Sequence, residues 1–556
     1  MKKFWKIILT VAAILAAIVL GTAWYLNNHW KGIMDKQLRR YVSEGSDSLY
    51  TLAYGDISLN LLTGSVSIKN VALLPDSAVY NRLVAESRAP QMIYNAKMSY
   101  VRVSGLKIWK YFIGKEVDAS GFTMEDPEIT VVQDLRSRDT TPQKSFYAAM
   151  NQLIHNFRIG RIDLANTRLS YVQIREDSSR KITKLDNLDV RLRDLQIDSM
   201  TEKDLSRVLY AQNFDVSLEK WDYRTPDSLY WLHVNNISYN AIEKALSVEN
   251  VQLEPRYKKA DFDKKIVTQN DRFELAFNHI KAEGVTLQNL LRQTIFIRTA
   301  SIDGGELHAY RNRALPYPPG DKYGGFPNQL LDKLQLPLTI DTLKAQGVHI
   351  SYTELHPQTG EAGRIEFHQA GGTFTNITNQ DSLIERNHHC IADLHAVLMR
   401  TGKLRARFDF ELGSKTGVFG VSGQLRGMDG REMNPATRPL GEVAIRSANI
   451  REMDFNLKGN ERSCSGTLRL LYSDLKIDFL KDMENAKGKK RKKGLVSFIA
   501  NLMALHNENP PPDGPVRIAK PRFTRDPKKS FFNLVWKTIF TGIKETVLTD
   551  AAAGLM

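Results

Sequence analysis

DSLYTLAYGDISLNLLTGSVSIKNVALLP, residues Asp47–Pro75, returns later in the chain as DSLYWLHVNNISYNAIEKALSVENVQLEP, residues Asp227–Pro255. The two stretches align without gaps at an offset of 180 residues, and 13 of their 29 positions are identical. Across residues 57–68, apolar and polar residues alternate on either side of Thr63-Gly64. A period of two interrupted by a glycine turn predicts a β-hairpin. The chain therefore contains the same predicted hairpin twice.

The likeness continues beyond the hairpin with small gaps. Residues 127–132 correspond to 305–310, and Leu169-Ser170-Tyr171 corresponds to Ile350-Ser351-Tyr352. The shared positions are mostly apolar residues, Ser, Asn and Pro, which suit a structural repeat rather than an active site. We therefore expect two units built to one plan, spanning 47–226 and 227–406, whose neighbouring edges cover each other within one sheet.

Most of the remaining body also alternates. The pattern recurs at 188–192, 214–218, 348–352 and 408–412, and a third alternating segment follows at 407–480. Helical patterns are few and short, for example 144–154 and 327–334. The sequence predicts a mainly β protein whose strands form a long antiparallel meander, that is, an elongated and twisted sheet.

The start of the chain reads as a membrane anchor. FWKIILTVAAILAAIVLGTAWYL, residues 4–26, has no charge from Ile7 onward, and twenty residues give roughly 30 Å of helix, enough to cross a hydrocarbon core. Lysines before it keep the N-terminal side in the cytoplasm, so everything after it lies on the far side of the membrane. A cleaved signal peptide is the alternative, with Gly21-Thr22-Ala23 as its cleavage site. No second run of this length occurs, which predicts a single pass. The anchor residues are Ile7, Leu9, Ile14, Leu15, Ile18, Leu20 and Trp24.

The net charge of +15 is concentrated at the C-terminus. Residues 487–548 hold 14 Lys and Arg against 4 Asp and Glu, an excess of +10. This tail contains the basic run KGKKRKK (487–493), a helical pattern at 495–506, a Pro-rich linker and a final helix at 530–548 with lysines along its apolar stripe. A basic tail suits anionic lipid or nucleic acid, and the anchor favours lipid. The final helix either lies on a membrane surface or caps the open end of the sheet; its residues are Lys528, Lys529, Phe532, Trp536, Ile539, Phe540 and Ile543.

Chemistry-bearing motifs are sparse. No phosphate-binding glycine loop, nucleophile elbow, zinc-protease motif or paired-carboxylate motif occurs. His388-His389-Cys390 has metal-binding residue types, but no partner stands at a metal-site spacing, so ordinary strand residues are expected. With only two cysteines, Cys390 and Cys464, a disulfide scaffold and a multi-cysteine zinc site are excluded, and one bridge stays open. We expect neither an enzyme nor a cofactor.

The order of these features resembles the AsmA-like family of bacterial envelope proteins, the relatives of TamB that group with bridge-like lipid-transfer proteins. The first stretch that shows this resemblance is the anchor followed by the hairpin Ile57-Ser58-Leu59-x-Leu61-x-x-Gly64-x-Val66-x-Ile68-x-Asn70-Val71. The other is Val418–Ile477, which is similar to the family's late β segment. The resemblance covers most of residues 1–480, and the basic C-terminal helices depart from it.

The resemblance implies a sheet rolled into an open groove with an apolar inner face, an inner-membrane anchor, a periplasmic body, and a role in phospholipid movement or outer-membrane homeostasis. The expected parts are a tail and anchor at 1–30, β-groove units at 31–226 and 227–406, a terminal β segment at 407–480 and a basic helical tail at 481–556. Expected groove-lining residues are Ile57, Leu59, Leu61, Ile237 and Tyr239. Partners would be the membrane, phospholipid or another acyl lipid, and envelope proteins, but not nucleic acid. The alternative is a non-enzymatic assembly or scaffold factor for outer-membrane proteins.

Overall fold

A computed structural model describes residues 39, 42–43, 46, 48–60, 63–86, 88–107, 110, 113–136, 155–201, 204, 207, 210–479 and 505–549. It is mainly β, as predicted from the alternation, with a large mixed sheet. The chain divides into two compact units. Unit 1 contains residues up to Trp221 with 234–248 and 286–291, and unit 2 contains 222–233, 249–285 and the residues from Arg292 onward.

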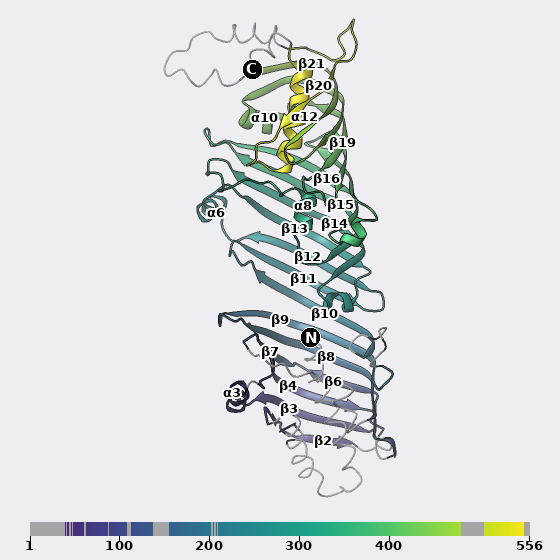
Figure 1. Ribbon diagram of the computed structural model, residues 1–556. Coiled ribbons are helices and arrows are strands. Elements are labelled where there is room, and N and C mark those ends of the chain that lie inside the picture. Colours follow the sequence, from purple (N-terminus) through teal and green to yellow (C-terminus); the bar gives the residue numbers. More distant parts are fainter. Residues whose placement is uncertain are drawn as a thin grey trace. The chain divides into compact units, whose positions relative to one another are not determined.

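Unit 1 is built on a sheet, with helix α3 between its third and fourth strands (Figure 1). Its elements are β1 (Tyr50–Ala53), β2 (Ile57–Asn60), β3 (Ser65–Pro75), α3 (Ser77–Ala85), β4 (Met92–Ser104), β5 (Glu116–Ala119), β6 (Gly121–Glu125), β7 (Glu128–Asp134), β8 (Asn156–Ile174), β9 (Arg180–Ile197) and most of β10 (Ala211–Arg224), with the short α7 (Leu287–Leu291) added from later in the chain. β11 (Tyr230–Asn240) and β12 (Ala245–Pro255) are shared between the units.

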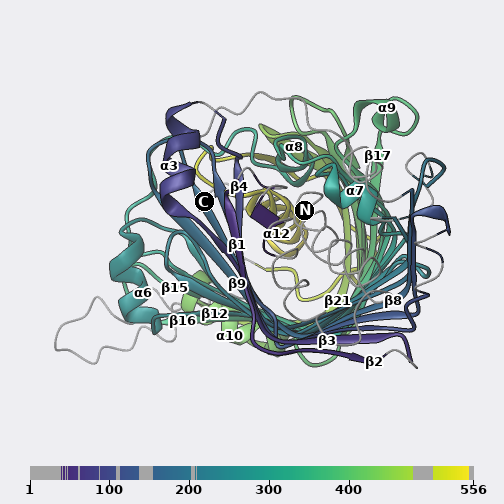
Figure 2. The same cartoon turned by 90° about the horizontal axis from the view of Figure 1, so that it is seen from below.

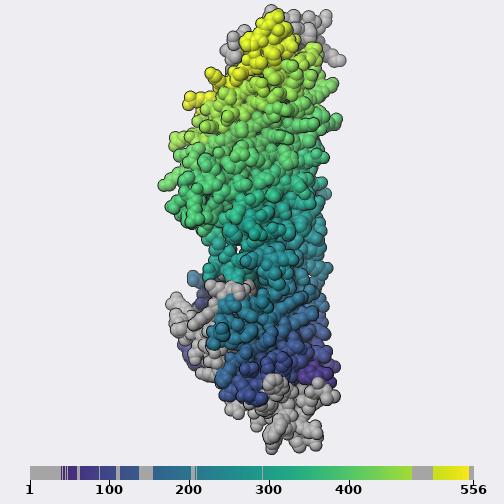
Figure 3. Space-filling view, turned by 90° about the vertical axis from the view of Figure 1, so that its right-hand side faces the viewer, coloured from purple at the N-terminus to yellow at the C-terminus, as the bar shows by residue number. Residues whose placement is uncertain are grey.

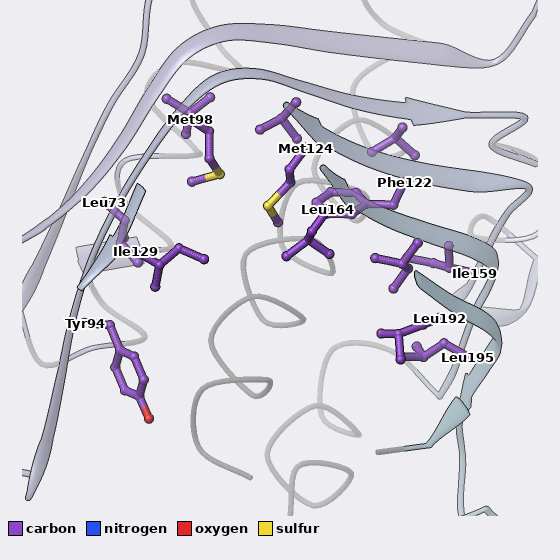
Figure 4. Close-up of a cluster of buried hydrophobic side chains, with 14 of the residues drawn as sticks. Leu73, Tyr94, Met98, Phe122, Met124, Ile129, Ile159, Leu164, Leu192 and Leu195 are labelled. Carbon is purple, nitrogen blue, oxygen red and sulfur yellow. The ribbon is translucent and has the colours of Figure 1, made fainter. Parts of the chain in front are cut away.

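One face of the unit 1 sheet is strongly apolar. Alternation places the apolar side chains of β3, β4 and β6–β9 on the same side, where they form a buried cluster (Figure 4). Ala96 of β4 pairs with Ile129 of β7, and Ile162 of β8 pairs with both Phe122 of β6 and Leu192 of β9. The cross-strand register therefore carries apolar rows from strand to strand across this face.

Unit 2 is a longer sheet that curves around its last helix (Figures 1 and 2). Its elements are α6 (Lys259–Ile266), β13 (Asp271–Glu283), β14 (Ile295–Asn312), α8 (Pro327–Asp332), β15 (Leu338–Leu355), β16 (Ala362–Thr378), α9 (Asp381–Ile384), β17 (His389–Leu398), β18 (Gly402–Glu411), β19 (Phe419–Asp429), the 3₁₀ helix η1 (Gly430–Met433), α10 (Asn434–Gly441), β20 (Val443–Gly459), β21 (Ser463–Phe479), β22 (Ile518–Ala519), β23 (Arg522–Thr524) and α12 (Phe531–Val547). From β15 to β21, each strand pairs antiparallel with the next.

The prediction of a purely antiparallel meander was wrong, because the sheet is mixed. In unit 1, β8 runs parallel to β5, β6 and β7, and in unit 2, β14 runs parallel to β15. Parallel neighbours need a connection that returns to the starting end of the sheet. Residues 313–337 make that connection between β14 and β15 and are long enough to include α8.

The sequence repeat is a repeat of structure. In unit 1, Ile129 of β7 pairs in parallel with Leu169 of β8; in unit 2, the equivalent Leu307 of β14 pairs in parallel with Ile350 of β15. The crossover therefore occurs at the same point of each repeat.

Smaller details recur as well. The Tyr50 hydroxyl accepts a hydrogen bond from the backbone N–H of Tyr94 at 3.1 Å, and the Tyr230 hydroxyl accepts one from the N–H of Phe273 at 3.2 Å. Left-handed backbone recurs at matched positions, with φ of 62° at Ser48 against 61° at Ser228, and 50° at both Asn70 and Asn250. The identities between the two hairpins thus include residues that fix turns and tie neighbouring strands.

Candidate functional site

The predicted groove-lining residues fall in unit 1. Ile57 belongs to its buried apolar cluster. Tyr239 is half-buried, packs against the same cluster, and has its ring centroid 6.3 Å from that of Phe214. Ile237 is half-buried. Leu59 lies in β2, but its side chain, like all of Leu61, is outside the described residues.

The anchor residues Ile7 to Trp24 and the basic run 487–493 also lie outside the described residues. So do the predicted helix at 144–154 and most of the one at 495–506. Within the part of the chain that the structure describes, no helix is both long enough and apolar enough to cross a membrane.

The final helix, α12, lies inside the curve of the unit 2 sheet, and we call the face of the sheet that it contacts the concave face (Figure 2). Ser530 caps its start by accepting a hydrogen bond from the N–H of Asn533. Phe531 then inserts among the rings of Phe326, Phe408, Phe410 and Phe419, with centroid distances of 4.8 to 6.2 Å. In Figure 3 the C-terminal residues, in yellow, pack directly against the green surface of the late strands.

Small residues let α12 approach β21 closely. A Cβ atom on Gly542 would lie 3.0 Å from the Cβ of Leu468 and 3.1 Å from the Cγ of Pro521. Thr538 and Thr546 are buried on the same side and satisfy their hydroxyls on backbone carbonyls one turn earlier. The buried face of the helix is therefore set by small residues as much as by large ones. It consists of Phe531, Leu534, Val535, Thr538, Ile539, Gly542 and Thr546.

The opposite face of α12 is also apolar but remains exposed. Phe532, Trp536 and Phe540 recur every fourth residue and are 68%, 41% and 39% exposed, respectively. The rings of Trp536 and Phe540 stack at 6.1 Å. We call these three residues the aromatic stripe. The seven residues predicted for this helix thus separate: Ile539 is buried, Ile543 packs half-buried against the core, the three aromatics are exposed, and the two lysines precede the helix.

A row of apolar side chains crosses the strands on the same face of the sheet. Register pairs Leu275 with Leu307, Leu307 with Ile350, Ile350 with Phe367, and Phe367 with Leu398. Directly paired residues point to the same side of a sheet, so these five form one row, which we call the concave ladder. All five are half-buried.

Register also places the ladder on the side of α12. Leu398 pairs with Gly402 of β18, and alternation from Gly402 brings Phe408 and Phe410 to the same face. Those two rings contact Phe531 of α12. The ladder and the aromatic stripe therefore border the same side of the unit 2 sheet.

A charged row lines one end of this face. Arg311 pairs with Asp271 through two hydrogen bonds of 2.7 and 2.5 Å, and Arg313 pairs with Glu354 at 2.8 Å. The hydroxyl of Tyr352 donates to Glu354 at 2.8 Å, and burial raises the pKa of that tyrosine. Two arginines are thus matched by two carboxylates, and the row is neutral.

Three lysines add positive charge beside this row. Reduced hydration lowers the pKa of Lys537, and repulsion from Arg313, Lys544 and Lys529 lowers it further. Reduced hydration also lowers the pKa of Lys322, with further repulsion from Arg311 and Lys529. Arg525 donates hydrogen bonds to the backbone carbonyls of both Lys322 and Lys529, which holds these two residues close together. The carboxylates Asp271 and Glu354 partly oppose the lowering of the pKa of Lys322 and Lys537, respectively. We call Lys322, Lys529 and Lys537 the lysine rim.

The outer, convex face of the same strands is polar. Arg407 contacts Asp393 at 2.6 and 2.8 Å, and His389 contacts Asp409 at 2.7 Å. Cys390, the next residue along β17, points to the concave side and is buried, which raises its pKa to about 11. His389 and Cys390 therefore face opposite ways.

Two other expectations concern metals and disulfides. Across the described residues, no group of three or more His, Cys, Asp or Glu side chains is placed to hold a metal ion. Cys390 and Cys464 are both free and buried.

Sequence reasoning missed the concave ladder. The alternation at 348–352 was recognised, but the partners of Ile350 come from four other strands, and only the register identifies them. It also missed Lys322, which stands in a loop about 200 residues before Lys529. The sequence signal that pointed to the lysine rim was the presence of Lys529 and Lys537 beside the apolar stripe of the C-terminal helix.

No protein-family model matches the chain, and no curated protein matches it.

Proposed function

We propose that this is an AsmA-like protein, anchored in the inner membrane, whose periplasmic β body carries or shields phospholipid along an apolar groove for outer-membrane lipid homeostasis. The observation that supports it best is that the half-buried concave ladder and the exposed aromatic stripe border the same side of the unit 2 sheet. An apolar surface that a fold leaves partly uncovered in its own concavity is typical of a ligand-binding surface.

The dimensions suit an acyl chain. Five strands at about 4.8 Å spacing give the concave ladder a length of roughly 19 Å. One leaflet of a bilayer has about 15 Å of hydrocarbon, half of the whole core. Each CH₂ group transferred from water to such a surface gains about 0.8 kcal/mol. A whole acyl chain can therefore lie along the ladder and avoid most of the cost of leaving a bilayer.

The location rests on the sequence. The uncharged run after Ile7, with lysines before it, is the basis for an inner-membrane anchor and a periplasmic body. Family membership rests on the hairpin and the late β segment, and the repeated crossover fits a fold that grows by adding units.

Site-directed photocrosslinking tests the proposal. A photoreactive phenylalanine analogue is placed at Leu307 or Phe367 on the ladder, and at Glu306 or Arg364 on the convex side of the same strands. Full-length protein is irradiated in cells with labelled phospholipid. We expect lipid adducts at the two ladder positions and few or none at the convex ones.

Adducts at equal levels on both faces, or at neither, contradict the proposal. Capture of a polypeptide at the ladder positions in place of lipid favours the assembly or scaffold function. The two positions of each pair lie on the same strand and receive the same photoreactive analogue. They differ mainly in the face of the sheet that they report on.

A further inference from the structure

Lysines add positive charge to the concave side of unit 2 beyond the two ion pairs of the charged row. Its two arginines are already paired with Asp271 and Glu354. For the described part of the chain, no carboxylate lies within the 4.0 Å salt-bridge distance of the ammonium groups of the lysine rim. The three charges of the rim therefore lack a direct ion pair, and the nearest carboxylates named for them, Asp271 and Glu354, are already paired with arginines.

Two of these lysines, Lys529 and Lys537, contact aromatic rings instead. The ammonium of Lys529 lies 4.8 Å from the ring centroid of Tyr317, and that of Lys537 lies 5.7 Å from that of Phe540. The ammonium of Lys544 lies 5.9 Å from the ring centroid of the same Phe540. A ring compensates for only part of the hydration that a cation loses.

The rim also adjoins the aromatic stripe, because Lys537 follows Trp536 and touches Phe540. A ligand that satisfies both features has an anionic end and an apolar end. Lysine binds phosphate groups as a flexible point charge, without the fixed geometry that arginine demands.

We propose that the lysine rim and the aromatic stripe form a binding site for the anionic headgroup of a phospholipid, which makes the protein selective for anionic over zwitterionic lipids. The inference rests on the proposed function and adds a selectivity to it. The phosphate lies among Lys322, Lys529 and Lys537, and the acyl chains continue over Phe532, Trp536 and Phe540 toward the concave ladder.

The test measures headgroup preference directly. Full-length protein in neutral detergent carries the photoreactive analogue at Phe540 and is mixed with vesicles containing equal amounts of phosphatidylglycerol and phosphatidylcholine. Adducts of each lipid are counted by mass spectrometry. The wild-type rim should capture phosphatidylglycerol in clear excess.

The variant K529Q/K537Q should reduce that excess by about fivefold for each lysine removed. The control K403Q/K458Q removes the same charge from exposed positions on the convex side of β18 and β20 and should leave the ratio unchanged. A second control adds inorganic phosphate, which at equal concentration should compete weakly because it gains nothing from the stripe.

Equal capture of the two lipids by wild type overturns this inference and leaves the proposed function standing. Capture of neither lipid at Phe540, together with none at the ladder, overturns both. Full competition by inorganic phosphate identifies a free-anion site and overturns the lipid form of the inference.

Discussion

The concave and convex faces of β13–β18 are formed by the same strands but differ in what covers them. On the convex face, ion pairs such as Arg407–Asp393 stand in water, with both side chains more than half exposed. On the concave face, the ladder from Leu275 to Leu398 is only half-buried, and α12 covers the sheet mainly near β21–β23. Alternation explains why one face is apolar. It does not explain why that face is left partly open, and this difference is the reason for assigning a ligand to it.

The largest effect is expected where the concave face is fully packed. Leu534 of α12 is 0% exposed, so Leu534→Asp buries a carboxylate without a partner and leaves a cavity. We expect a loss of about 5 kcal/mol in the free energy of unfolding, or undocking of the helix, measured by urea denaturation.

The matched change on the other side of α12 is Phe532→Asp. Phe532 is 68% exposed, so its free energy of unfolding should change by less than about 1 kcal/mol, while lipid capture at Phe540 falls. Equal destabilisation by the two changes would show that the exposed stripe is in fact packed.

Ion pairs on the two faces offer a second comparison. The side chains of Arg311 and Asp271 on the concave face are 14% and 24% exposed, against 53% and 55% for Arg407 and Asp393. Arg311→Gln should cost about 3 kcal/mol, because it leaves a poorly hydrated carboxylate without its cation. Arg407→Gln should cost less than about 1 kcal/mol. Thermal unfolding of both variants measures the difference. Similar decreases in melting temperature would show that the ion pairs on the two faces contribute equally to stability.

Cysteine reactivity tests the closed part of the concave side. Burial raises the pKa of Cys390 to about 11 from its ordinary value of 9.0, so the thiolate fraction near pH 8 falls about a hundredfold. Alkylation by iodoacetamide should be slower than for a free thiol by at least that factor and become fast in urea. Because the folded state holds this proton more tightly, its stability should decrease as the pH rises from about 9 toward 11. Rapid alkylation of the native protein at pH 8 would place Cys390 outside the core.

The smallest effect concerns the repeat. Tyr230→Phe removes the hydroxyl that accepts from the N–H of Phe273, at a cost of about 1 kcal/mol. Tyr50→Phe should cost a similar amount, because its hydroxyl accepts from Tyr94 in the same way. Chemical denaturation of the two variants checks the equivalence, and a loss from only one would show that the second repeat has changed the role of this tyrosine.

The sequence predicted the strands and the repeat because both leave a pattern that can be read directly. Strands show as alternation of apolar and polar residues, and the repeat shows as identical residues, such as Tyr50 and Asn70, at matched positions. The sequence did not predict the parallel pairing of β14 with β15, since alternation is the same whichever direction a neighbour runs. The final helix was located correctly but its faces were not resolved. The helix has two apolar faces, and the single stripe recognised in the sequence contains residues from both, such as the buried Ile539 and the exposed Phe540. Gly542 and Thr538 decide the contact with β21, and small residues give little signal in a pattern of hydrophobicity.

The connection between β14 and β15 bears on how a bound lipid would leave the concave face of unit 2. β14 ends at Asn312 and β15 begins at Leu338 at the other end of the sheet, so residues 313–337 cross its width. This segment packs against α12 through Phe326 and Phe531, and Arg525 fixes it by donating to the carbonyl of Lys322. The segment is thus fixed to α12 and to Arg525 on the concave side. For the proposed lipid function, this predicts that a lipid leaves the concave face along its length rather than past this segment.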